Sequence, residues 1–265
     1  MHFIWKEWKE NIRGKGLWLA IGTIILVSVL LLVRSTSLSY DQGLYILLIN
    51  LFDTLIYFIP ILYLFMGAFS IFQEKEQKTL VMLLTKQESY WTFLAKKSIG
   101  MHLVFLTPVI IWFFLFLIPL KIFFKADIGT YLVFVLSITV LMLIFTQIGA
   151  LIGSISRSRM QIAGIAVIIW FYFFFLHDFA LLSIIQGVTY DNVKLFSIAY
   201  FLNPIQAVRM YLETGVGIYS FGHMSRLLKS FMWLPPGAFL GASLIFWMAA
   251  TFISSVLLHR KEGFE

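Results

Sequence analysis

Cysteine is absent from the 265 residues of this chain, and charged residues make up only 12% of it. Without cysteine the chain can form no disulfide, no zinc–thiolate site and no thiol redox centre. The small charged fraction excludes an ordinary soluble domain, in which about a quarter of the residues are charged. Hydrophobic residues reach 60% and the mean hydropathy is +0.91, so the composition predicts a membrane protein with several spans.

The sequence also lacks the signatures of a catalytic or nucleotide-binding protein. It contains no G-x-x-x-x-G-K-[ST] motif, so it cannot bind nucleotide phosphates through a P-loop. No set of acid, base and nucleophile suggests a membrane enzyme, and the histidines and methionines are scattered rather than set at metal-ligand spacing. We therefore expect a chain that is not an enzyme and that itself binds no metal or cofactor. The net charge of +7 fits cations that orient membrane spans better than it fits nucleic-acid binding.

Six apolar stretches are long enough to cross a bilayer, which takes about 20 helical residues. No internal repeat or low-complexity linker divides the chain, so we expect one all-α polytopic domain over residues 1–265. The pairs Gly149/Gly153 and Gly237/Gly241 have G-x-x-x-G spacing, which permits close helix contacts within the domain or at a dimer interface. The expected spans are Leu17–Val33, Leu51–Phe72, Ser98–Leu120, Thr130–Gly153, Ile162–Ile185 and Gly237–Leu258.

The distribution of Lys and Arg predicts how these spans are oriented. Of the 20 such residues, 13 fall in segments on the same side as the N-terminus and 7 fall on the other side. Cytoplasmic loops carry an excess of Lys and Arg. We therefore expect a multi-pass protein of the plasma (inner) membrane with both termini in the cytoplasm.

The first fifteen residues form an amphipathic pattern. Ile4, Trp5, Trp8 and Ile12 fall on one helical face, whereas Glu7 and the other charged residues lie largely elsewhere. Tryptophan at the headgroup level with charge on the opposite face is typical of a helix that lies in the interface. A cleaved secretory signal is the alternative, but the pattern favours an uncleaved interfacial helix that leads into the first span.

The segment between the last two spans, residues 186–236, is long and contains Asn203-Pro204 and Pro235-Pro236. Its apolar pieces, such as Leu195–Leu202, are too short to cross a bilayer. We therefore expect short helices here that rest on the outer leaflet or dip into it.

Few ionisable residues lie inside the expected spans. Asp53, His177 and Asp178 fall near the outer ends of their helices, and His102 lies roughly one to two turns from the cytoplasmic edge. An ion-coupled secondary transporter needs a carboxylate or a broken helix near the middle of the bilayer. A secondary transporter or channel that works without an ATPase is therefore the weaker alternative from another functional class.

Residues 72–87, FQEKEQKTLVMLLTKQ, place charge and a short amphipathic pattern on the cytoplasmic side of two spans. Thr79 is a plausible N-cap, and Leu80, Leu83 and Leu84 follow at the i, i+3, i+4 spacing of one helical face. Such a helix can lie flat on the headgroups or insert its apolar edge into a groove on a soluble partner. The pattern alone does not separate these two interpretations.

This stretch resembles the coupling segment of ABC-2 type transporter permeases, which usually reads E-x-E-x-G-T-L-x-x-L-L and is followed by a lysine and a glycine at the start of the third span. Lys78 stands where the family usually has glycine. A second stretch, Gly149–Trp170, is similar to the fourth helix, short basic loop and fifth helix of the family. The matching positions in the first stretch are Glu74, Glu76, Thr79, Leu80, Leu83, Leu84, Lys97 and Gly100.

The resemblance implies a six-span permease with an N-terminal interfacial elbow helix, a cytoplasmic coupling helix and external re-entrant helices before the last span. Permeases of this family act as homodimers with separate ATP-binding cassette subunits, which bind ATP and Mg²⁺. The coupling helix docks into a cleft on the ATPase and passes its closure to the spans. The residues to which the resemblance gives this contact are Glu74, Glu76, Thr79, Leu80, Leu83 and Leu84.

Two further stretches resemble the NosY-like branch of permeases, which serves nitrous oxide reductase maturation. They are Trp170 with Leu176-His177-Asp178, and Leu202-Asn203-Pro204 followed by Arg209. The branch implies transport or mechanical signalling for a copper–sulfur enzyme centre and an extracytoplasmic accessory protein on the outer face. An ABC-2 exporter of drugs, peptides or lipids is the alternative within the family. The residues implied to meet the external partner or to form a gate are His177, Asp178, Asn203, Pro204 and Arg209.

The docking interpretation predicts that the double substitution Leu80→Asp and Leu83→Asp abolishes co-purification of the ATPase. Two carboxylates forced into an apolar cleft would have to give up their hydration, which is strongly unfavourable. Affinity purification of the tagged chain in detergent measures the effect. Normal ATPase recovery with the double variant would contradict the interpretation.

Overall fold

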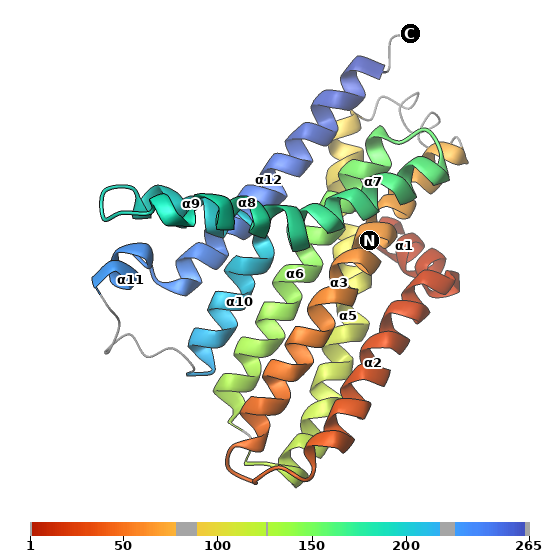
Figure 1. Ribbon diagram of the computed structural model, residues 1–265. Helices are drawn as coiled ribbons and strands as arrows, with labels where there is room; N and C mark the ends of the chain where they lie inside the picture. Colours follow the sequence, from red (N-terminus) through yellow and green to blue (C-terminus); the bar gives the residue numbers. More distant parts are fainter. Residues whose placement is uncertain (1, 78–88, 126, 218–225, 263–265) are drawn as a thin grey trace.

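The computed structural model describes residues 2–77, 89–125, 127–217 and 226–262, and every regular element in this part of the chain is a helix (Figure 1). The first half contains α1 (His2–Arg13), α2 (Lys15–Ser35), α3 (Gly43–Glu76), α5 (Tyr90–Phe123) and α6 (Ile128–Ile155). The second half contains α7 (Arg159–Phe171), α8 (His177–Ile184), α9 (Val193–Leu202), α10 (Pro204–Gly215), α11 (Arg226–Phe231) and α12 (Pro236–Glu262). A π-helical turn (Tyr172–Leu176) joins α7 to α8, and a 3₁₀ turn (Ile185–Gly187) follows α8.

Six of these helical stretches are long and apolar enough to cross a membrane, which confirms the six spans expected from hydropathy. They are α2, α3, α5, α6, the continuous stretch Arg159–Gly187, and a last stretch that contains α12. Several begin at side-chain caps. Ser89, Asp127 and Ser158 each accept a hydrogen bond from a backbone N–H three residues later. The caps satisfy amides that have no partner within the helix.

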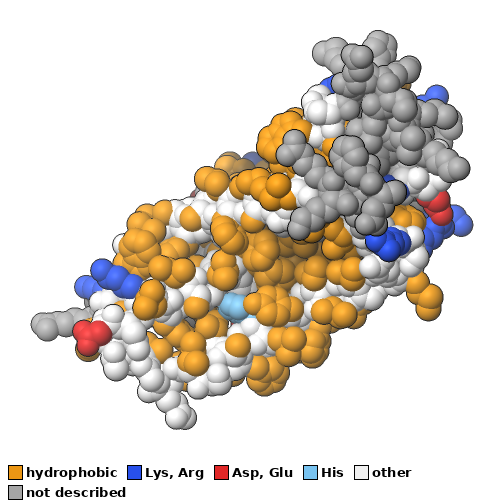
Figure 2. All heavy atoms as spheres, turned by 90° about the horizontal axis from the view of Figure 1, so that it is seen from above, with side chains coloured by type: hydrophobic (Ala, Val, Ile, Leu, Met, Phe, Trp, Pro, Cys, Tyr) orange, Lys and Arg blue, Asp and Glu red, His pale blue; other side chains and the backbone are white. Residues whose placement is uncertain are grey.

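The surface that these helices expose is largely apolar. Figure 2 shows hydrophobic side chains over the middle of one face, while most of the charged side chains in view lie toward its two ends. Large apolar side chains such as Trp18, Phe114 and Ile245 are exposed. Surface of this kind needs lipid around it, as expected for a multi-pass membrane protein.

Both termini lie at one end of the helical bundle, which we call the N/C end. Glu7 of α1 contacts Lys97 at the start of α5, and Ser255 of α12 contacts Ser154 at the end of α6. At the opposite, far end, the loop before α3 pairs with the end of α5 through the Lys125 N–H and the Tyr40 carbonyl, 3.0 Å apart. An even number of spans brings the chain back to the end at which it started. The expectation that the N/C end faces the cytoplasm stays a prediction.

α3 and α6 form the tightest helix pair, because glycines let their backbones touch. A Cβ atom on Gly67 of α3 would lie 2.3 Å from the Thr146 carbonyl oxygen, and one on Gly149 of α6 would lie 2.4 Å from that of Leu64. Gly153 approaches Ala68 in the same way. The G-x-x-x-G spacing of Gly149 and Gly153 therefore serves packing within the chain.

α9 and α10 meet in a sharp turn at Asn203-Pro204 and point in different directions (Figure 1), and both are short helices as expected in residues 186–236. The turn packs against the middle of other helices. The Trp247 indole N–H of α12 donates to the Leu202 carbonyl over 2.9 Å, and the Asn203 amide donates to the Phe173 carbonyl over 2.7 Å. Phe173 is 14 residues beyond the start of α7, or roughly 21 Å along a helix. The turn at Asn203-Pro204, which we call the apex, therefore lies well inside the bundle.

α10 then runs from this apex toward the far end. Its last residue, Gly215, lies against Val133, which is in the second turn of α6. α10 therefore lies along α6 and ends near the far end, and the expected re-entrant arrangement stays a prediction.

Filling the α3–α6 contact should destabilise the protein. Gly67→Ala and Gly149→Ala each place a methyl group against a backbone carbonyl that cannot move aside, and overpacking of this kind costs about 1–3 kcal/mol. We expect a lower thermal unfolding midpoint in detergent for both variants. Gly164→Ala in α7 is the matched control, because a Cβ there meets no atom within 4 Å. An equal loss in the control, or none in the variants, would show that the contact is not tight.

Candidate functional site

A buried lysine joins three helices at the N/C end. The Lys97 Nζ of α5 lies 2.5 Å from a Glu7 carboxylate oxygen of α1 and 3.0 Å from a Glu74 carboxylate oxygen of α3. The three side chains are 2%, 0% and 4% exposed. A buried charge is tolerated when it is paired and hydrogen-bonded. Here one ammonium group is held by two carboxylates.

A second lysine closes the arrangement at its solvent side. Lys6 Nζ lies 3.2 Å from the same Glu74 oxygen and 3.6 Å from Glu10. Burial alone would lower the pKa of Lys6, but the Glu74 and Glu10 carboxylates raise it on balance. Burial raises the pKa of Glu7, and the neighbouring Lys97 opposes that shift. We call these five residues the Lys97 network.

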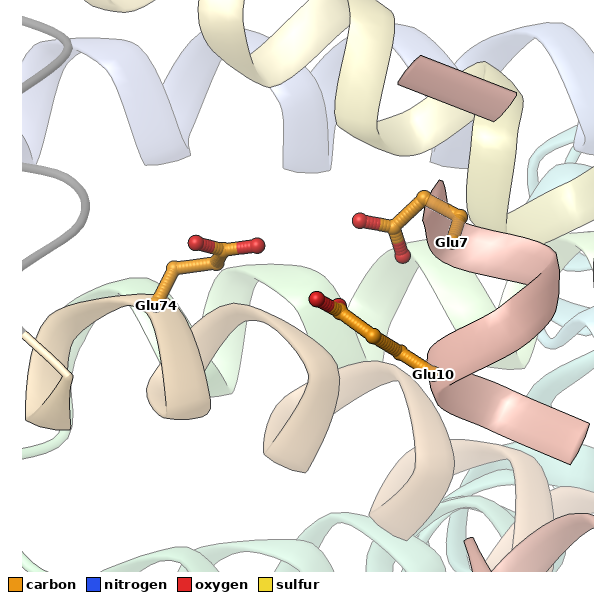
Figure 3. A group of neighbouring side chains, drawn as sticks. All are labelled: Glu7, Glu10 and Glu74. Atoms are coloured by element: carbon orange, nitrogen blue, oxygen red, sulfur yellow. The ribbon is translucent and has the colours of Figure 1, made fainter. Parts of the chain in front are cut away.

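The three carboxylates of this network point toward one another from α1 and α3, as Figure 3 shows. Oxygens of Glu7, Glu10 and Glu74 all lie within 4.8 Å of each other, a spacing that could hold a metal ion. The Lys97 and Lys6 ammonium groups bind these same oxygens, however. Protein cations therefore already supply the positive charge that the carboxylates require.

Ser154 gathers a second set of contacts at the N/C end. Its hydroxyl accepts from the Tyr90 hydroxyl of α5 over 3.1 Å and from the Ser255 hydroxyl of α12 over 2.5 Å. Its carbonyl accepts from Lys75 of α3. The last turn of α3 and the first turn of α5 are thus fastened to α1, α6 and α12. These are the two turns from which residues 78–88 extend.

The residues predicted to contact an ATPase are divided between described and undescribed parts of the chain. Glu74 is buried in the Lys97 network, and Glu76 is exposed and pairs with Arg159 over 2.6 Å. Thr79, Leu80, Leu83 and Leu84 lie outside the described residues, as does Lys78. The docking surface therefore stays a prediction, while the Glu74 carboxylate is engaged inside the chain.

α1 turns Glu7 toward the bundle and most of its apolar face away from it. Glu7 is fully buried, while Trp5 is 70% exposed, an orientation compatible with the expected interfacial helix. The apolar face of α1 points outward, where lipid can cover it, and only Trp8 of its two tryptophans packs partly on the core. One signal was available. Lys97, at the edge of an apolar span, requires a carboxylate from elsewhere in the chain.

A second cluster of polar side chains lies at the apex, the turn between α9 and α10. Asn203 is fully buried; its amide donates to the Phe173 carbonyl, and its side-chain oxygen accepts from the Ile205 N–H over 3.0 Å, which caps α10. His177 Nε2 lies 3.0 Å from the Ala199 carbonyl, so that nitrogen carries the hydrogen. Its Nδ1 lies 3.3 Å from the Asn203 amide nitrogen and 3.4 Å from an Asp178 carboxylate oxygen.

Gln206 extends this group to Asp178. Its amide nitrogen lies 2.9 Å from both Asp178 carboxylate oxygens, and its own oxygen accepts from the Tyr200 hydroxyl over 3.0 Å. We call His177, Asp178, Tyr200, Asn203 and Gln206 the apex cluster. Three of its members were singled out from the sequence as an external contact or gate. Tyr200 and Gln206 were missed, because their contacts depend on how α8, α9 and α10 pack.

Two other residues of that predicted set lie outside the apex cluster. Pro204 occupies the first position of α10 and is buried. Arg209 lies 3.7 Å from Asp53 of α3, so it forms a separate ion pair farther along α10. The structure therefore brings together His177, Asp178 and Asn203, but not Arg209.

Comparison with known protein families gives the identity of this assembly of helices. A family model described as "ABC-2 family transporter protein" matches residues 1–263. The chain belongs to the ABC-2 transporter family. None of the curated proteins compared with it matches. As an ABC-2 permease subunit it lacks ATPase activity, and ATP hydrolysis lies on a partner chain.

Lys97→Met should destabilise this ABC-2 permease by about 3–5 kcal/mol, because it leaves the Glu7 carboxylate buried without its cation and leaves Glu74 with only the partly exposed Lys6. Thermal unfolding in detergent measures the effect. Lys96→Met is the matched control, since the neighbouring lysine is exposed. Combining Lys97→Met with Glu7→Gln and Glu74→Gln should restore most of the stability. A single variant as stable as the control would contradict the assigned burial.

Proposed function

We propose that this ABC-2 permease receives movement from its ATPase through residues 78–88 and passes it to the spans through the Lys97 network. The observation that carries the proposal is the anchoring on both sides of this segment. Glu74 and Lys75 hold the end of α3, and Tyr90 and Lys97 hold the start of α5. A load applied to the segment therefore reaches α1, α6 and α12 at once.

The energetics of the network favour rigid movement over local yielding. Pulling Glu74 away from Lys97 would break a contact between two buried charges and leave Glu74 with only the partly exposed Lys6, which is unfavourable. An exposed pair such as Glu76 and Arg159 is worth less than about 1 kcal/mol and can exchange partners. Glu74 then acts as a positioning residue, whereas Glu76 remains available to the ATPase.

We further propose that two copies of the chain associate, each with an ATPase subunit that holds ATP and Mg²⁺. The Gly237/Gly241 pair supports this, because a Cβ on Gly241 meets no atom within 4 Å in the chain. Exposed apolar side chains such as Phe246 and Ile253 lie on the same helix, α12. With the N/C end in the cytoplasm, the far end would face the outer side.

The NosY-like assignment remains the finer proposal. Its sequence support comes from two stretches that meet in space, since Asn203 and His177 are hydrogen-bonding partners in the apex cluster. That contact makes the two stretches one structural unit. In this version the far end binds an extracytoplasmic accessory protein, and the complex supports nitrous oxide reductase maturation. Export of drugs, peptides or lipids is the alternative, and a neighbouring nitrous oxide reductase gene would favour the first version.

Purification of the tagged chain from its native membrane, followed by mass spectrometry, should recover an ATP-binding cassette subunit and any external partner together. Glu74→Gln should keep the ATPase bound but reduce the ATPase rate of the complex severalfold, because the docking surface persists while its base loosens. Asp191→Asn, in an exposed turn beyond α8, is the control. Recovery of the wild-type chain without any ATPase would overturn the proposed function. Loss of ATPase binding in Glu74→Gln would overturn only the positioning role.

A further inference from the structure

A pocket of about 360 Å³ lies between α8, α9, α10 and α11 and shares Asp178, Tyr200 and Gln206 with the apex cluster. Leucine, isoleucine and methionine side chains form much of its wall. Asp178 and Gln206 supply its polar groups, and Phe196, Tyr200 and Phe231 supply aromatic rings. Its volume is within the usual range for sites of small organic molecules, roughly 300–1,000 Å³.

The charge of this pocket is unbalanced. Asp178 is its one acidic residue, and none of the described residues that line it is Lys or Arg. His177 lies beside this carboxylate, with its Nδ1 3.4 Å from an Asp178 oxygen and 3.3 Å from the Asn203 amide nitrogen. Arg209, the nearest cation along α10, pairs with Asp53 instead. The Asp178 side chain is 44% exposed, so its carboxylate is accessible to a cationic ligand that enters the pocket.

Gln206 holds this carboxylate in a fixed orientation. Its amide donates to both Asp178 oxygens, while the Tyr200 hydroxyl fixes the amide from the other side. The amide hydrogen bonds do not cancel the negative charge. The carboxylate is therefore preorganised toward a ligand.

The aromatic side chains form a continuous wall. The rings of Tyr200 and Phe231 are 5.4 Å apart and inclined by 69°, and Phe196 and Phe231 are 6.1 Å apart. Aromatic faces attract organic cations, and grouped aromatic rings are a common way to bind quaternary ammonium ions. A hard metal cation instead needs several oxygen ligands, whereas this pocket offers one carboxylate and a mostly apolar wall.

We propose that this pocket binds the ammonium group of an amphipathic organic cation, with Asp178 as counter-charge and the rings of Phe196, Tyr200 and Phe231 around the alkylated nitrogen. The apolar side chains would cover the rest of the ligand. This site goes beyond ATP coupling and does not depend on ATPase docking, so binding can be measured on the full chain alone.

Calorimetric titration of the purified full chain in a choline-free detergent tests the site with two probes of nearly the same shape. Benzyltrimethylammonium carries the charge, and neopentylbenzene replaces its nitrogen by carbon. We expect the cation to bind at least about tenfold more tightly than its neutral counterpart. Equal affinity for the two probes would overturn the proposal and leave only an apolar hollow.

Three variants locate the binding. Asp178→Asn should weaken cation binding about tenfold or more and leave the neutral probe unaffected, and Phe231→Leu should weaken the cation severalfold. Asp191→Asn removes an exposed carboxylate outside the pocket and should change neither affinity. Unfolding midpoints confirm that each variant is folded. Unchanged cation affinity in folded Asp178→Asn would overturn the assignment.

A trimethylammonium group can come from a free amphipathic cation or from the choline headgroup of a lipid. Repeating the titration in nanodiscs of phosphatidylcholine and of phosphatidylglycerol separates these sources. Weaker apparent binding of the cation in phosphatidylcholine alone identifies the headgroup as a competitor for the same site. Equal binding in both lipids identifies a free cation as the ligand.

Discussion

The ammonium group of Lys97 sets the organisation of the N/C end. It lies at an edge of apolar helices where an unpaired charge would be strongly unfavourable, so carboxylates must reach it. Glu7 can do so only if α1 folds back across the start of α5, and Glu74 can do so only if α3 continues to its last turn. One buried cation thus fixes the position of α1. It also fixes the end of α3 and the start of α5, which flank residues 78–88.

The glycine contact between α3 and α6 complements this constraint. Gly67 and Gly149 bring the two backbones together, which gives the bundle a stiff axis. Because α3 carries Glu74 and α6 carries Ser154, both sets of N/C-end contacts are attached to that axis. α10 also packs against this axis, since Ile205, Val208 and Leu212 are buried in the main hydrophobic core.

Hydropathy predicted the spans well, because crossing a bilayer requires a length and composition that a single sequence displays. The Gly149/Gly153 spacing likewise indicated a close helix contact. Pairings between distant helices could not be predicted in this way. Glu7 looked like a surface charge because its partner is 90 residues away in the sequence. Arg209 was expected to act together with Asn203, but it forms an ion pair with Asp53 of α3 instead.

α12 connects the two candidate sites. Ser255 contacts Ser154 at the N/C end. Trp247 lies eight residues earlier on the same helix, or roughly 12 Å away, and its indole N–H donates to the Leu202 carbonyl beside the apex. A tilt of α12 that follows the N/C end would therefore act on Leu202 and on the apex cluster beside it. If that tilt changes the affinity of the Asp178 pocket, a ligand in the pocket must bias the N/C end by the same free energy, because coupling between two binding sites is reciprocal. Ligand binding in the pocket would then affect the N/C end and its ATPase as much as the ATPase affects ligand binding.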